Sequence, residues 1–309
     1  MHGCSRARCA ARSTAPREPV ALSWSRDGAD WPNRELSAFV ETEANRWHVQ
    51  RGGSGPRILL LHGAGAATHS WRDVIPRLLP RFEIMAPDLP GQGFSTGTAR
   101  RFTLPCMAAD LRRLLAAEDF DPQMIVGHSA GGAIALRMAL DLAPSPRHVL
   151  CLNGALTPFS GMAGVVFPPL AKLLSLNPLT ASLFARTAGA PGAVRNLIEG
   201  TGSRIDARGL ALYRRLVGDA GHVAATLAMM ARWDLDPLIA ALPRLAPCVT
   251  LALGERDRAV PPQGARRLAP RIPDARLIAF PALGHLMHEE APDEIAALIA
   301  QVASEPDCG

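Results

Sequence analysis

Short apolar runs alternate with longer segments of helical spacing through most of this 309-residue chain. Each apolar run has the length of a buried β-strand, and each intervening segment has apolar residues three and four positions apart, as on one face of a helix. Strands that alternate with helices in this way form a mostly parallel sheet covered on both faces. The strand-like runs are 57–62, 83–86, 124–126 and 148–152, and the helical segments are 70–79, 104–117 and 130–142. A stretch of alternating polarity at 39–51 predicts an antiparallel hairpin before them.

The alternation stops between residues 155 and 234, where apolar positions recur at helical spacing between Pro and Gly breaks. Long loops without structure are uncommon, so we expect an all-helical cap here. The earlier pattern resumes with strands at 249–253 and 277–280 and helices at 262–272 and 292–302. The prediction is therefore an α/β core of residues 30–154 and 235–309, with a helical cap of residues 155–234 inserted before the last two strands. Residues 1–29 are rich in Arg, Ser and Ala and lack the apolar region of a secretory signal, so we expect a disordered leader and not a signal peptide.

A pentapeptide of the form G-x-S-x-G, Gly127–Gly131 (GHSAG), directly follows one predicted strand and opens a helix. A strand, a sharp turn and a helix are the context that a nucleophile elbow requires. Such a turn would lift the hydroxyl of Ser129 above the carboxyl edge of the sheet, beside a helix N-terminus. Taken alone, the motif fits a Gly-rich turn before an ordinary helix equally well.

Two further residues complete a serine-hydrolase pattern. A serine hydroxyl is a weak nucleophile until a base takes its proton, and a carboxylate must orient that base. Asp257 follows the strand at 249–253 and His285 follows the strand at 277–280, in the order that this fold uses. We therefore predict Ser129 as nucleophile, Asp257 as acid and His285 as base. Glu255 remains an alternative acid.

Supporting residues are predicted around this set. An oxyanion hole needs two backbone N–H donors, for which we expect Ala130, after the nucleophile, and Ala64, in the loop after the strand at 57–62. His62 and the loop at 88–95 are expected to support the site without taking part in chemistry. His288, Glu289 and Glu290 are expected at the solvated start of the last helix.

Charge and composition narrow the function classes. The net charge of +5 is scattered, without a basic stripe bearing aromatics, so nucleic acid is not an expected partner. The sequence contains no run of about 18 apolar residues, so no transmembrane segment is predicted. No His, Cys and carboxylate cluster has metal-ligand spacing, and we expect no metal and no cofactor. Six cysteines are dispersed, with Cys151 and Cys248 in apolar runs that suit free thiols. The expected location is therefore the reducing cytoplasm, with peripheral membrane attachment left open.

With these motifs in place, the chain resembles the α/β-hydrolase superfamily over about residues 39–303. More narrowly, it resembles the magnesium-chelatase accessory proteins of bacteriochlorophyll biosynthesis. The segments that carry this narrower resemblance are Asp30–Glu35, Trp47–Gln50, Thr68–Asp73, Leu176–Leu179, Glu199–Arg204 and Met229–Leu238. The resemblance implies a role that assists magnesium insertion into protoporphyrin IX, and association with magnesium chelatase. The chain has no G-x-x-x-x-G-K-[ST] phosphate loop, so it is not the ATP-driven motor of that enzyme.

Three functions stay open at this point. The first is a hydrolase acting through an acyl-enzyme on a hydrophobic acyl or tetrapyrrole-type ester. The second is a non-catalytic protein that binds porphyrin or assists the chelatase, because a fold does not fix a function. The third is a general esterase or cofactor-free haloperoxidase-like enzyme unrelated to pigments. Apolar residues in the cap favour a hydrophobic pocket, although an apolar stripe on a helix more often serves helix packing. They are Phe167, Leu170, Leu173, Leu174, Phe184, Met229, Met230 and Trp233.

Overall fold

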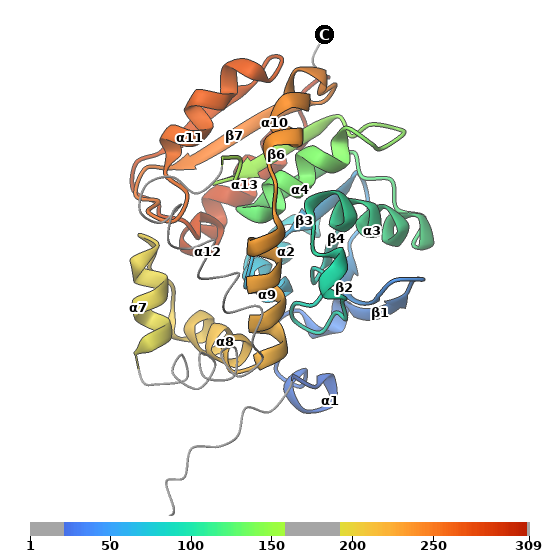
Figure 1. The fold of residues 1–309 in the computed structure, drawn as a ribbon, viewed down its shortest axis with the longest axis vertical. Helices are drawn as coiled ribbons and strands as arrows, with labels where there is room; N and C mark the ends of the chain where they lie inside the picture. The colour runs from blue at the N-terminus through green and yellow to red at the C-terminus, as the bar shows by residue number, and fades with distance from the viewer. Residues whose placement is uncertain (1–21, 158–191, 308–309) are drawn as a thin grey trace, which may run out of the picture.

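An eight-stranded sheet forms the centre of the molecule in the computed structural model, which describes residues 22–157 and 192–307 (Figure 1). The strand order is β1-β2-β4-β3-β5-β6-β7-β8. β1 and β2 form an antiparallel hairpin, β2 is antiparallel to β4, and all other neighbours are parallel. This confirms the predicted mostly parallel sheet. The strands are β1 (Ser37–Glu41), β2 (Arg46–Gly52), β3 (Arg57–Leu61), β4 (Glu83–Pro87), β5 (Met124–His128), β6 (His148–Leu152), β7 (Cys248–Gly254) and β8 (Arg276–Phe280).

The central strands are apolar on both faces because helices cover both sides of the sheet. On β3, Ile58 and Leu60 belong to one buried cluster, whereas Leu59 and Leu61 belong to another. The first cluster is completed by α2 (Ile75–Leu78) and α13 (Pro292–Ala303), and the second by α3 (Leu104–Ala117) and α4 (Ala130–Ala139). Continuous apolar runs, rather than alternating ones, are what such doubly covered strands require.

Most predicted helices are present, with one clear difference. The segment expected as one helix at 70–79 is a 3₁₀ turn, η2 (Thr68–Trp71), followed by the short α2. Pro76 lies in the first turn of α2, where its missing N–H costs nothing, but it cannot continue an earlier helix. The remaining helices of the core are α10 (Asp236–Ala241), α11 (Pro262–Leu268) and α12 (Met287–Glu290), with 3₁₀ turns η1 (Arg34–Leu36), η3 (Ala99–Arg101), η4 (Leu242–Arg244) and η5 (Ala269–Arg271).

The described part of the predicted cap is helical. It consists of α7 (Ala193–Gly200), α8 (Ala207–Val217) and α9 (Ala220–Arg232), which Figure 1 shows together in the lower half of the molecule. Asp206 and Asp219 cap α8 and α9, each accepting a hydrogen bond from the backbone N–H three residues on. The cap residues between Phe167 and Phe184 that were expected to line a pocket lie outside the described residues. None of the described helices combines the length and hydropathy needed to cross a membrane.

The predicted boundary of the leader is wrong at residues 22–29. Trp24–Asp27 form the short helix α1, and the ring of Trp24 packs against Phe39, His48 and Phe94. The backbone N–H of Leu22 donates to the carboxylate of Asp219 in the cap. An aromatic side chain with this much area to bury orders the chain before the first strand.

The cysteines differ in part from the expectation. Cys151 is a free, buried thiol on β6, as its apolar surroundings suggested, and burial raises the pKa of this thiol to about 12. Cys248, at the start of β7, is disulfide-bonded, so the prediction of a free thiol there is wrong.

The β5–α4 turn packs so closely against β3 that it tolerates no side chain at two of its glycines. A Cβ on Gly131 would stand 2.2 Å from the carbonyl oxygen of Leu61, and one on Gly127 would stand 2.2 Å from the carbonyl oxygen of Gly131.

We predict that Gly131→Ala lowers the free energy of unfolding by about 3 kcal/mol or more, because backbone atoms must move to make room for the new Cβ. Gly200→Ala is the matched control: a Cβ there meets nothing within 4 Å. This second change should be neutral or stabilising by up to about 1 kcal/mol. Urea unfolding of both variants tests the pair, and equal losses would contradict the explanation.

Candidate active site

Ser129 occupies the sharp turn between β5 and α4. Its backbone angles are φ 50° and ψ −116°, a combination that non-glycine residues rarely adopt. The turn is held by β6 and the chain after it: the Ser129 N–H donates to Leu152 O (3.0 Å), and Ser129 O accepts from the N–H of Ala155 (2.9 Å). These bonds fix the backbone of Ser129 and do not involve its hydroxyl group. This is the geometry of a nucleophile elbow.

Asp257 and His285 lie together at the carboxyl ends of β7 and β8. Asp257 Oδ2 is 2.7 Å from His285 Nδ1, and Asp257 Oδ1 accepts from the N–H groups of Ala259 and Val260 at 2.8 Å each. An ionised carboxylate only accepts hydrogen bonds, so His285 Nδ1 carries the proton and Nε2 is left as a base. Glu255, the alternative acid, instead pairs with Arg266. Between the two candidates, the structure therefore brings Asp257 to His285.

His128, which precedes Ser129 in the chain, contacts His285 and so links the nucleophile candidate to the base candidate. The rings of His128 and His285 are 4.8 Å apart, and His128 Nε2 is 2.9 Å from the carbonyl oxygen of His285. Ser129, Asp257 and His285 are 8%, 5% and 8% exposed, so each is largely shielded from water. Among the described residues, no hydrogen bond joins the Ser129 hydroxyl to His285. Such catalytic contacts are often long in the absence of substrate.

The loop after β3 lies directly against the elbow. A Cβ on Gly63 would stand 2.8 Å from His128 Nδ1 and 3.1 Å from the Cβ of Ser129. Ala64, next along this loop, is half-buried, and Ala130 begins α4. Among the described residues, neither amide donates a hydrogen bond in a turn or loop. Ala64 and Ala130 thus belong to two segments that meet at Ser129.

Two neighbouring loops are joined by the neutral imidazole of His62. Its Nδ1 bonds Gly63 O (2.8 Å) and its Nε2 accepts from the N–H of Leu89 (2.9 Å). Burial lowers the pKa of His62 to about 4, so the ring is neutral and keeps one donor and one acceptor. The supporting role predicted for His62 agrees with these contacts.

Asp88 organises the loop at 88–95. Its carboxylate accepts from the N–H groups of Thr68 (2.7 Å) and Phe94 (2.9 Å) and from His48 Nδ1 (2.8 Å). Burial raises the pKa of this carboxyl group, but His48 and these hydrogen bonds outweigh it, and the resulting pKa is about 2. A charge held this firmly inside the protein fixes three chain segments near the site.

The cap helix α9 is anchored on these loops. His222 Nδ1 accepts from the N–H of Gly93 (3.0 Å), and its Nε2 lies 3.1 Å from Gly65 O. Burial lowers the pKa of His222, which keeps Nδ1 free to accept. Met229 on the same helix is 1% exposed and belongs to the main core cluster. For Met229, helix packing is therefore the better interpretation.

The expectation for His288 and Glu289 is wrong, because both are buried. They lie on α12, and they are 0% and 7% exposed. Glu289 forms an ion pair with Arg72 and accepts from the Tyr213 hydroxyl (2.8 Å) on the cap helix α8. Arg72 also pairs with Asp206, at the start of α8 (3.1 Å). A buried ion pair four residues beyond His285 therefore links the core to the cap.

Sequence reasoning also missed Asn153, which is 2% exposed and follows β6. Its side chain bonds the loop that carries His285 and the end of β7. The signal was available, since Asn153 directly follows a strand at the carboxyl edge, as Asp257 and His285 follow theirs.

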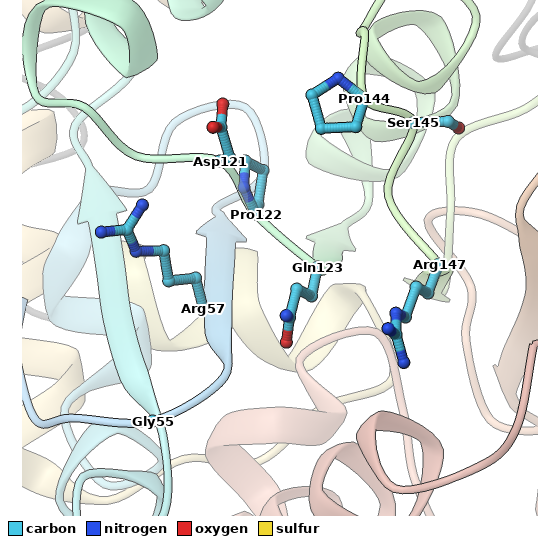
Figure 2. Close-up of a pocket in the computed structure, with 8 residues that line it drawn as sticks. All are labelled: Gly55, Arg57, Asp121, Pro122, Gln123, Pro144, Ser145 and Arg147. Carbon is cyan, nitrogen blue, oxygen red and sulfur yellow. The ribbon is translucent and has the colours of Figure 1, made fainter.

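A cavity of about 450 Å³ lies at the opposite edge of the sheet (Figure 2). Arg57, Gln123 and Arg147, at or just before the first residues of β3, β5 and β6, line it together with Ser145. The amino ends of parallel strands face away from Ser129, so this cavity is separate from the candidate active site.

Comparisons with known proteins identify the fold family of the chain. Residues 56–292 match the family model described as the alpha/beta hydrolase fold. The magnesium-chelatase 30 kDa subunit of Rhodobacter capsulatus is 46% identical over 274 residues, 88% of this chain and 95% of that protein. Haloalkane dehalogenase 2 of Mycobacterium tuberculosis is 29% identical, over 86% of this chain and 94% of that protein.

Solved structures support the fold. The epoxide hydrolase CorEH superposes with a TM-score of 0.73 at 22% identity, covering 86% of this chain and 97% of its own. An esterase from Exiguobacterium antarcticum gives a TM-score of 0.72 at 20% identity, with coverage of 87% and 100%. At these identities the likeness establishes shared architecture alone.

The link between cap and core should depend on pH. Burial raises the pKa of Glu289 to about 7, although Arg72 and Tyr213 oppose the shift, and Asp73 adds to it. Between pH 4.5 and 7 the folded state then keeps a proton that the unfolded chain has lost, so stability falls as the pH rises through this window. The stabilisation is complete below pH 4.5, and the loss up to pH 7 is on the order of 3 kcal/mol.

Urea unfolding at several pH values measures this effect in the wild type and in Glu289→Gln, which has no proton to lose. The fall in the free energy of unfolding between pH 4.5 and 7 should be absent from Glu289→Gln. It should persist in Glu294→Gln, which changes an exposed carboxylate on α13. Parallel pH profiles for the wild type and Glu289→Gln would show that Glu289 does not titrate in this range.

Proposed function

Since the chain belongs to the α/β-hydrolase fold family, we propose that it is a serine hydrolase with Ser129 as nucleophile, His285 as base and Asp257 as acid. The observation that carries the proposal is the Asp257–His285 hydrogen bond of 2.7 Å, next to a serine held at φ 50°. A strained backbone persists only where its surroundings enforce it, and such strain clusters at functional sites. A scaffold protein would have no physical need for this combination.

The proposed chemistry proceeds through an acyl-enzyme. Ser129 Oγ attacks the carbonyl carbon of an ester while its proton passes to His285 Nε2, and the leaving alcohol takes that proton as it departs. Water then attacks the acyl-enzyme, giving its proton to His285, and the acid leaves as Ser129 recovers its own. Asp257 stays ionised throughout, fixing the tautomer of His285 and stabilising its charged form.

The proposed oxyanion hole consists of the backbone N–H groups of Ala64 and Ala130. The close approach of the Gly63 loop to Ser129 supports this assignment, as does the position of Ala130 at the start of α4. Backbone donors held rigidly before reaction stabilise developing negative charge without reorganising, and removing one typically costs about 100- to 1,000-fold in rate.

For the biological role, we propose an accessory function in bacteriochlorophyll biosynthesis that supports magnesium insertion into protoporphyrin IX. The identity of 46% to a magnesium-chelatase 30 kDa subunit, over 95% of that protein, supports this role. The substrate would be a hydrophobic acyl or tetrapyrrole-type ester, and magnesium chelatase would be the partner. This accessory function would take place in the cytoplasm, and attachment to the periphery of a membrane is an alternative.

A second candidate function is non-catalytic binding of porphyrin or support of the chelatase. Two observations favour it: the similar protein is named as a chelatase subunit, and no described hydrogen bond joins Ser129 to His285. On this alternative, the three residues would be present but idle.

Labelling with a fluorophosphonate probe tests the hydrolase. We expect the purified protein to be labelled covalently, because the probe reacts with serines activated by a base. Ser129→Ala should abolish labelling. Ser145→Ala, which removes a hydroxyl at the opposite edge of the sheet, should label like the wild type (Figure 2). Equal labelling of Ser129→Ala and the wild type would refute Ser129 as the nucleophile.

Pigment synthesis in a strain that carries Ser129→Ala tests the biological role. The hydrolase proposal expects bacteriochlorophyll to fall to the level of a deletion strain while the folded protein accumulates normally. The binding alternative expects wild-type pigment. Normal pigment in the deletion strain itself would contradict both roles in this pathway.

A further inference from the structure

Asn153 is a buried polar side chain near the candidate triad that has no part in the proposed chemistry. Its Oδ1 accepts from the N–H of Gly254 (2.7 Å). Its Nδ2 donates to the carbonyl oxygens of Gly284 (2.9 Å) and His285 (3.0 Å). Both amide hydrogens and the amide oxygen are thus used, and the residue is 2% exposed.

These three bonds join the end of β7, which leads to Asp257, to the loop that carries His285. Gly254 ends β7 and lies three residues before Asp257, whereas Gly284 and His285 form the loop that carries the base. Asn153 therefore sets the position of the His285 main chain relative to the segment that holds Asp257. An asparagine suits this task because it combines an acceptor with two donors on one rigid plane.

A second donor reaches the same carbonyl from the nucleophile side. His128 Nε2 lies 2.9 Å from the His285 oxygen, and burial keeps the pKa of His128 well below its usual value, so the ring is a neutral donor there. The carbonyl of His285 thus receives one hydrogen bond from the residue beside Ser129 and one from Asn153.

The backbone conformation of Asn153 also suits this position. It has φ 47°, in the left-handed region, where asparagine is tolerated better than most residues. Its own N–H donates to Ala252 O on β7 (2.9 Å). The chain thus turns sharply after β6 and presents the amide to both loops.

From these contacts we propose that Asn153 is a positioning residue, which holds the imidazole of His285 in register with Asp257 and Ser129. This proposal rests on the proposed hydrolase function. Asn153 touches neither substrate nor reacting atoms. It acts through the main chain of His285, and a displacement near 1 Å at such a group costs roughly 100-fold in rate.

Two variants of Asn153 separate the amide from the backbone. Asn153→Gly removes the amide and accepts the left-handed backbone without strain. Asn153→Asp keeps the shape but sets one carboxylate oxygen, in place of Nδ2, against the carbonyl oxygens of Gly284 and His285. The matched control is Gln50→Ala, because Gln50 is also a buried amide (1% exposed) whose Nε2 donates to two backbone carbonyls, Pro32 O (2.6 Å) and Asn33 O (3.3 Å). It lies on β2, away from the triad.

The first measurement is the fluorophosphonate labelling rate as a function of pH. Both Asn153 variants should label at least 10-fold more slowly than the wild type at the optimum, with a shifted pH midpoint. Gln50→Ala should lose comparable stability in urea but keep the wild-type rate and midpoint. A rate and midpoint in both Asn153 variants equal to those of the wild type would overturn the proposal.

The second measurement does not depend on activity. In protein labelled with ¹⁵N-histidine, the proton on His285 Nδ1, bonded to Asp257, should give a downfield NMR signal that Asp257→Asn removes. This signal should broaden or move upfield in Asn153→Gly and stay in place in Gln50→Ala. If the wild type does not label but the signal responds in this way, the hydrolase function fails and the positioning role stands. If the wild type labels and the signal is unchanged in Asn153→Gly, the positioning role fails and the hydrolase stands.

Discussion

The turn at Ser129 is the constraint on which the rest of the candidate site depends. A residue with a side chain is held at φ 50° and ψ −116° because the chain has no room to relax. α4 approaches β3 so closely that Gly131 faces the carbonyl of Leu61, and the end of β6 holds the backbone of Ser129 through Leu152. The parallel order β3-β5-β6, with helices on both faces, therefore dictates where the hydroxyl stands. Strain of this kind persists only when packing outweighs it, so the stability of the core and the shape of the elbow cannot be separated.

Around this turn, buried neutral histidines link loops that have no regular structure of their own. His62 joins the loops after β3 and β4, His128 joins the elbow to the His285 loop, and His222 joins the cap to two glycine-rich turns. Burial lowers the pKa of each ring. His62 and His222 each use one nitrogen as an acceptor, from the N–H groups of Leu89 and Gly93, and protonation would remove that acceptor. These two links therefore hold only while the rings are uncharged.

The sequence predicted those features that periodicity and chain order control. Strand and helix patterns predicted the sheet. The order of Ser129, Asp257 and His285 after three of the predicted strands pointed to a candidate set, in which the structure places Asp257 Oδ2 2.7 Å from His285 Nδ1. Features that depend on distant contacts were not predictable in this way. Glu289 reads as a solvated helix start until its partners, Arg72 and Tyr213, are known to converge on it from 217 and 76 residues away. Likewise, the sequence around Trp24 is typical of a polar leader, and only the structure shows that Phe39 and Phe94 pack against it.

The cap is attached to the same segments that hold the site. Tyr213 on α8 bonds Glu289, four residues beyond His285, and His222 on α9 bonds Gly65, the residue after Ala64. A displacement of α8 or α9 would therefore strain a hydrogen bond near His285 on one side and near Ala64 on the other. A substrate that seats well under the cap would favour the arrangement in which both are aligned, because a ligand shifts an equilibrium only by its difference in affinity for the two states. Under the proposed function, binding of the substrate and alignment of the proposed catalytic groups would then be coupled.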